Sequence, residues 1–174
     1  MADAVLLILR VPEADDQDVV LKRINGHLDV STAGNRYFSI NEDAADKAFN
    51  YASRSSGRMV ALQILTSDLF HWGMNDNILS GAAKMRFIGH VREQVLEKSH
   101  ETTEMLRQKA IEYGVPLEIK SVETDDPVLA AFEEASRDYD RIFITKEREK
   151  VFPLFKKSMG QYLRKKINIP IIAG

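Results

Sequence analysis

Two kinds of side chain in this 174-residue chain carry groups able to do chemistry: a run of cations near its C-terminal end and four histidines. Cations hold anions, and Ser158, at the expected start of the last helix, offers a capping hydroxyl and a helix N-terminus to an anion. The same run, with Glu147 and Glu149 interleaved as partners, is equally typical of a solvated helix face. Both interpretations stay open for Lys146, Arg148, Lys150, Lys156, Lys157, Arg164, Lys165 and Lys166.

The other reactive residue types lack the spacings that metal or nucleophile chemistry requires. Cysteine is absent, which excludes disulfides, thiolate metal sites, iron–sulfur clusters and cysteine nucleophiles. There is no G-x-S-x-G, G-x-G-x-x-G or Walker motif of the kind that marks enzymes on related sheets. We therefore expect a protein that is not an enzyme and holds no metal. No H-x-x-x-H pair or other ligand spacing occurs among His27, His71, His90 and His100.

Composition and charge are those of an ordinary globular protein. Hydrophobic residues make up 44% and charged residues 29% of the chain. With 24 basic and 26 acidic residues the net charge is −2, so we expect neither nucleic acid nor a membrane surface as the main partner. The N-terminal apolar run Ala4–Leu9 is too short for a signal peptide or a membrane span, and we expect a cytoplasmic location.

The first 35 residues are expected to form an N-terminal β extension. Val5–Val11 is apolar enough for a buried strand and stops at Pro12. In residues 19–30, Asn25-Gly26 between two short β-compatible runs favours a hairpin. The alternative is a short helix that ends at Gly26. We favour the hairpin.

From residue 36 onward, strand and helix patterns alternate. The pattern predicts an open five-stranded parallel α/β sheet with helices on both faces over residues 36–174, because parallel strands need helical crossovers. The expected strands are 37–40, 59–65, 117–122, 141–144 and 169–172, and the expected helices are 41–53, 85–113, 128–138 and one within 146–166.

Two stretches of the chain resemble the universal stress protein family. One is Asp126–Ile144, which is similar to that family's helix, acidic residue and aliphatic strand before the phosphate loop. The other is Lys157–Arg164 followed by Asn168–Ile172, which is similar to the family's Gly-Ser, helix, proline and aliphatic strand at the end. The resemblance implies an adenine-nucleotide-binding type of sheet over residues 36–174.

The glycine loop with which family members hold ATP is missing from this chain. That loop has the form Gly, two residues, Gly, nine residues, then Gly-Ser or Gly-Thr. Aligned on Ser158, the glycines fall near Ile144 or Thr145, on Glu147 and on Lys157. Glycine lets backbone N–H groups approach a phosphate closely, and other side chains fill that space. The resemblance therefore implies a degenerate pocket, with no cofactor.

Six residues are candidates for binding any ligand that the pocket still accepts. The resemblance puts Asn41 in place of an acidic, nucleotide-contacting residue after the family's first strand, and puts the backbone of Ile64 and Leu65 near an adenine. As an alternative to an empty pocket, ATP, AMP or another phosphorylated molecule would bind there; a weak ATP-hydrolysing enzyme is a second alternative. The candidate residues are Asn41, Ile64, Leu65, Thr145, Lys157 and Ser158.

The last strand is expected to lie at an edge of the sheet. Strands as apolar as Ile169–Ile172 rarely stay uncovered there. Pairing with a second copy, as in the family, is the simplest cover and predicts a homodimer. Alternatively, Val5–Val11 folds back and covers an edge. The resemblance as a whole implies a regulatory role, through a protein partner, for a non-catalytic dimer.

Overall fold

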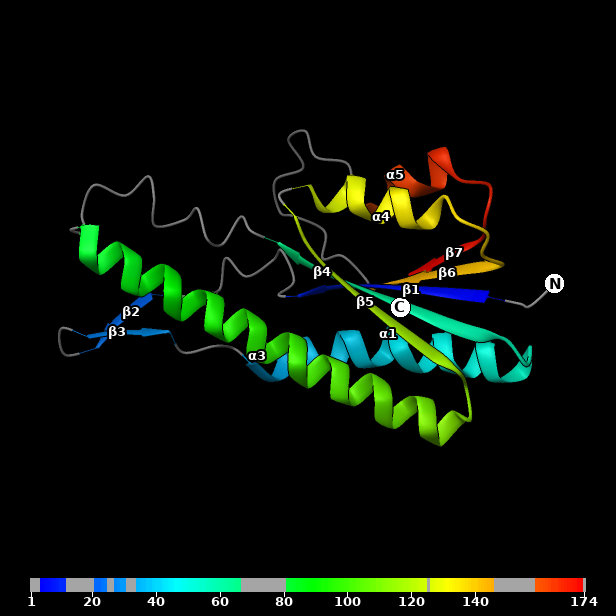
Figure 1. Cartoon of the computed structure of the whole chain (residues 1–174), viewed down its shortest axis with the longest axis horizontal. Coiled ribbons are helices and arrows are strands. Elements are labelled where there is room, and N and C mark those ends of the chain that lie inside the picture. The colour runs from blue at the N-terminus through cyan, green and yellow to red at the C-terminus, as the bar shows by residue number, and fades with distance from the viewer. Residues whose placement is uncertain are drawn as a thin grey trace.

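The computed structural model describes residues 4–11, 21–24, 27–30, 34–66, 81–124, 126–145 and 159–173. Strands and helices alternate along most of this part of the chain (Figure 1). The strands are β1 (Ala4–Val11), β2 (Leu21–Ile24), β3 (His27–Val30), β4 (Arg58–Thr66), β5 (Leu117–Thr124), β6 (Arg141–Ile144) and β7 (Ile171–Ala173). The helices are α1 (Gly34–Arg54), α3 (Gly81–Tyr113), α4 (Pro127–Ala135) and α5 (Met159–Lys166).

Five parallel strands form one sheet in the order β5-β4-β1-β6-β7. Helices α1 and α3 pack on one face of this sheet, and α4 and α5 pack on the other (Figure 1). The predicted fold class, an open parallel α/β sheet with helices on both faces, is confirmed. In the described part of the chain, no helix is apolar over enough residues to cross a membrane.

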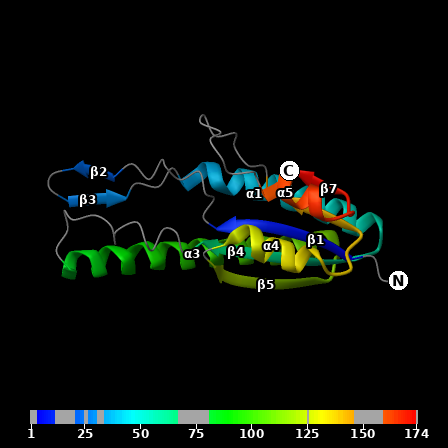
Figure 2. The ribbon, with the colours of Figure 1, turned by 90° about the horizontal axis from the view of Figure 1, so that it is seen from above.

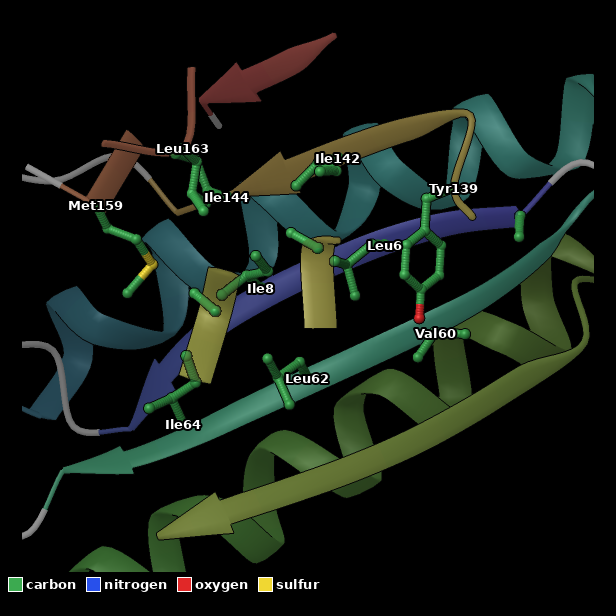
Figure 3. Packing of buried hydrophobic residues seen from close by; sticks show 13 residues of the cluster. Leu6, Ile8, Val60, Leu62, Ile64, Tyr139, Ile142, Ile144, Met159 and Leu163 are labelled. Carbon is green, nitrogen blue, oxygen red and sulfur yellow. The ribbon is translucent and has the colours of Figure 1, made fainter. Parts of the chain in front are cut away.

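The centre of the sheet is β1, which is buried on both faces. Leu6 and Ile8 pack in the cluster on the α4 and α5 side (Figure 3), whereas Leu7 and Leu9 pack in the cluster on the α1 and α3 side. Successive side chains of a strand point to opposite faces, so a strand covered on both sides must be apolar almost throughout. This explains the uninterrupted run from Ala4 to Leu9.

The central place of β1 corrects three expectations. Val5–Val11 is neither part of an extension nor a cover for an edge, because it lies between β4 and β6. A domain boundary after residue 35 would therefore separate the sheet from its middle strand. The strand expected at 37–40 is also wrong, since these residues form the first turns of α1. The β-compatible residues 37–40 are too few to outweigh the helical spacing of the alanines that follow them. The longer apolar run, β1, takes the place in the sheet that was expected for 37–40.

Other local predictions hold. The favoured hairpin in residues 19–30 is confirmed, because β2 and β3 pair antiparallel, with Ile24 opposite His27. Asp126 caps α4 by accepting a hydrogen bond from the backbone N of Leu129 at 2.9 Å. Gly114, at φ +63°, ends α3 in the left-handed conformation that glycine adopts readily. The last strand is at the sheet edge, as expected, although it covers Ile171–Ala173 and not 169–172.

Candidate functional site at the switch point of the sheet

The strand order places the candidate ligand site at the carboxyl ends of β1 and β6. After β1 the chain builds β4 and β5 on one side, and then it crosses to β6 and β7 on the other. Sheets of this type bind ligands where the strand order reverses, outside the carboxyl ends of the strands. Here that point lies between β1 and β6.

Arg10 is the charged residue at the carboxyl end of β1. It is half-buried and in register with Ile64 of β4. By the alternation of the strand it shares the face of Ile8, which α4 and α5 cover. Beside it, the backbone N of Thr145 donates to the carbonyl oxygen of Ile8 at 3.4 Å. Arg10 was not predicted as a site residue, because residues 1–35 were expected to lie outside the domain. The signal present in the sequence is a single arginine in an otherwise apolar run.

The side chain of Ile144 fills the space between β6 and α5. Ile144 is 5% exposed and packs with Met159 and Leu163 of α5 (Figure 3). A Cβ atom added to Gly160 would lie 2.7 Å from Cδ1 of Ile144, so any larger residue at position 160 would displace the Ile144 side chain. Thr145 is likewise buried. The two positions to which the first loop glycine was matched therefore carry buried side chains.

Ile64 and Leu65 lie at the carboxyl end of β4, next to this point. Both side chains are buried. Both residues are in register with β1 on one side and β5 on the other, so their backbone groups belong to the interior of the sheet. Their contact with an adenine stays a prediction.

Asn41 does not occupy the position that the resemblance suggested. It lies inside α1, whereas the first strand of the sheet is β1 and ends at Arg10 and Val11. The supposed equivalence to an acidic residue after the first strand is therefore wrong. Lys157 and Ser158 lie outside the described residues. Of the other candidates, the structure places Ile64, Leu65 and Thr145 at the same end of the sheet, with β1 between Thr145 and the other two.

Part of the basic run lies away from the switch point. Arg164, Lys165 and Lys166 are exposed in the last turn of α5. The helix begins at Met159, beside Ile144, and eight residues carry it about 12 Å away. Cations are stabilised at a helix C-terminus by the helix dipole. For these three residues a solvated surface is the better interpretation; the other five cations lie outside the described residues.

Comparison with solved structures identifies the fold. Over 97% of this chain and 93% of the other, the structure superposes on a universal stress protein family member from Burkholderia pseudomallei, with a TM-score of 0.55 and 11% sequence identity. Over 99% of both chains it superposes on the universal stress protein UspA from Lactobacillus plantarum, with a TM-score of 0.53 and 12% identity. The chain has the universal stress protein fold. No protein-family model and no curated protein matches the sequence.

Away from its switch point, this universal stress protein fold contains a buried carboxylate with charged partners. The carboxylate of Glu134 on α4 is 8% exposed and accepts hydrogen bonds from Lys120 Nζ at 2.6 Å and from the Tyr139 hydroxyl at 2.5 Å. Arg137 Nε lies 3.4 Å from the other oxygen. We call these four residues the Glu134 cluster. It joins α4 to β5 and to the turn before β6.

The Glu134 cluster holds an ionised carboxylate next to a protonated phenol. Burial alone would raise the pKa of Glu134, but the hydrogen bonds from Lys120 and Tyr139 outweigh burial and lower it below its usual value of 4.5. Burial and the neighbouring carboxylate raise the pKa of Tyr139. At neutral pH the carboxylate thus stays ionised and the phenol stays protonated, so neither group is matched to acid–base catalysis. None of these four residues was predicted from the sequence as a functional residue.

A second polar contact fixes α3 against the sheet. Gln63 of β4 is fully buried; its Oε1 accepts from the Ser99 hydroxyl at 2.7 Å, and its Nε2 donates to Thr103 Oγ1 at 2.8 Å. Buried amides remain in a core only when they are hydrogen-bonded in this way. Gln63 therefore sets the position of α3 along β4.

Proposed function

We propose that this protein is a non-catalytic regulatory protein that uses the universal stress protein fold as a binding scaffold and has a degenerate nucleotide pocket. The packing of Ile144 against Gly160 carries the proposal, because a core side chain stands where ATP-holding relatives are expected to have a bare glycine backbone. In the sequence, Glu147 and Lys157 replace the other two glycines. Side chains larger than that of glycine disfavour the close approach of backbone N–H groups to a phosphate.

We expect ATP at about 1 mM to leave the melting temperature unchanged. A site with a dissociation constant of about 10 µM would add about 2.7 kcal/mol at that concentration. For a domain of this size that amount corresponds to roughly 5–10 °C. Differential scanning fluorimetry with ATP and AMP measures the shift directly, and phosphate release from the same samples tests for hydrolysis.

The matched variant for this experiment restores two glycines, Glu147→Gly with Lys157→Gly. If lost glycines are the reason for weak binding, the variant gains a shift that the wild type lacks. A rise of several degrees in the wild type, or a nucleotide that copurifies with it in native mass spectrometry, would instead favour the ATP- or AMP-binding alternative. Phosphate release by the wild type that falls in Ser158→Ala and Lys157→Ala would favour the enzyme.

As part of the same proposal, the protein acts in the cytoplasm as a homodimer that recruits a protein partner, and β7 forms the dimer contact. Ile142 N donates to the carbonyl oxygen of Pro170 at 3.0 Å, so the backbone of Pro170 faces β6. Backbone groups alternate in direction along a parallel strand, so those of Ile171 and Ala173 face the free edge. An edge of this kind is a template for a second strand.

Ala173→Pro is expected to weaken this dimer by at least about tenfold. Proline removes the outward N–H of residue 173 and leaves the pairing with β6 intact, since proline is tolerated on an edge strand. Sedimentation velocity over a range of protein concentrations measures the change in association. Ala173→Ser keeps the N–H and serves as the control. Equal association of both variants and the wild type would exclude β7 as the contact.

A further inference from the structure

The first part of α3 extends beyond the sheet. The helix has 33 residues, or about 50 Å, and both ribbon views show its N-terminal part reaching past the ends of β4 and β5 (Figures 1 and 2). The first buried side chain described along it is Val95. Before that point every residue of α3 whose side chain is described is exposed, namely Gly81, Ala82, Met85, Arg86, Gly89, Arg92 and Glu93.

Two ion pairs show how α3 is oriented about its axis. Lys109 contacts Asp46 of α1 at 2.5 Å, and Arg92 lies 3.7 Å from Glu123 of β5. One flank of α3 therefore faces α1, and the other faces the β5 edge of the sheet. At 3.6 residues per turn, Met85, Gly89, Arg92 and Leu96 lie within about 60° of one another around the helix. We call this set the β5-side stripe.

The β5-side stripe is apolar at both ends and open in the middle. Met85 is 70% exposed and Leu96 is 53% exposed. A Cβ atom added to Gly89 would meet nothing within 4 Å, so the helix surface has space there for a side chain from outside. A helical segment of this length is marginal in water without a packed face. The stripe thus offers both a protruding side chain and a recess for one.

Charge along α3 changes sign between Arg92 and Glu93, within the stretch that the stripe spans. Residues 81–92 contain three cations, Lys84, Arg86 and Arg92, and no acidic residue. Residues 93–104 contain four glutamates and one lysine, a net charge of −3. Two such helices side by side in parallel would place like charges together. In an antiparallel pair, the net-positive block of each helix lies alongside the net-negative block of the other, and their attraction favours that orientation.

We propose that two copies of this chain associate through their β5-side stripes, with the α3 helices antiparallel. With residue 92 of one copy opposite residue 93 of the other, Leu96 of each copy lies over Gly89 of its partner. The contact is the same on both copies, as twofold symmetry requires. It goes beyond the proposed function, and it uses the β5 side of the sheet, opposite the β7 edge.

The absence of cysteine permits a direct test by disulfide cross-linking. Gly89→Cys and Leu96→Cys are purified separately, mixed, and oxidised with copper phenanthroline at about 100 µM protein. The mixture is expected to give a covalent dimer on a non-reducing gel. Each variant alone is expected to stay uncross-linked, because two copies of the same position would lie about seven residues, or roughly 10 Å, apart along the pair, beyond the reach of a disulfide.

Ile111→Cys, at a site that is 82% exposed on the same helix, is the control partner for Leu96→Cys. The proposal is overturned if the Gly89 and Leu96 mixture yields no more dimer than this control. It is also overturned if either single variant cross-links to itself as efficiently as the mixture, since that result indicates parallel helices. Both substitutions lie on exposed positions, and a melting curve for each variant verifies that the fold is intact.

Discussion

Deleting residues 1–11 is expected to abolish cooperative folding of this protein. Seven of the eight residues of β1 are buried, and the strand pairs with β4 on one side and β6 on the other. Each large apolar side chain contributes about 1.5–3 kcal/mol when fully buried, so the loss exceeds the 5–15 kcal/mol that typically stabilises a domain. Far-UV circular dichroism during urea titration measures the result. A cooperative transition in a chain of residues 12–174 would contradict a central β1.

A single substitution measures the contribution of β1 to stability without removing the strand. Leu7→Ala is expected to lower the free energy of unfolding by about 2–5 kcal/mol, because Leu7 is fully buried and truncation leaves a cavity. Leu129→Ala, at a half-exposed site on α4, is the matched control and is expected to cost less than about 1 kcal/mol. Similar costs for the two variants would mean that β1 does not occupy the core.

Lys120→Met is expected to lower the free energy of unfolding by about 3 kcal/mol at pH 7. It leaves the buried carboxylate of Glu134 without its ammonium partner, and removal of one partner of a buried ion pair typically costs 3–5 kcal/mol. We expect the lower end of this range because Tyr139 and Arg137 still contact the Glu134 carboxylate. Urea denaturation measures the loss. Lys165→Met, on an exposed site, is the control.

The cost of Lys120→Met is expected to shrink as the pH falls below 4.5. The folded protein lowers the pKa of Glu134 from 4.5, so the cluster stabilises the fold above pH 4.5 and loses this contribution as the pH falls through the lower, folded value. Once Glu134 is protonated it carries no charge, so the loss of the Lys120 ammonium group no longer destabilises the fold. Adding Glu134→Gln to Lys120→Met should recover part of the loss at pH 7. A cost that is constant between pH 7 and pH 3 would show that the pair is not coupled.

The class of the fold and most of its local elements could be predicted from the order of the amino acids alone. Strands near 59–65, 117–122 and 141–144, the hairpin in 19–30 and the start of α4 were predicted, because side-chain periodicity, turn residues and caps act within a few residues of the chain. The resemblance to the universal stress protein family rested on such local stretches, and the superposition confirmed the fold.

Which strand lies in the middle, and which residues meet around it, could be read only from the packed fold. An apolar run is compatible with an edge, an extension or a centre, and its place depends on which helices cross over it. The place of β1 brought Arg10 to the switch point and removed Asn41 from it. Likewise, the contact of Ile144 with Gly160 and the burial of Glu134 depend on pairs of elements packing together, and no spacing within one element encodes them.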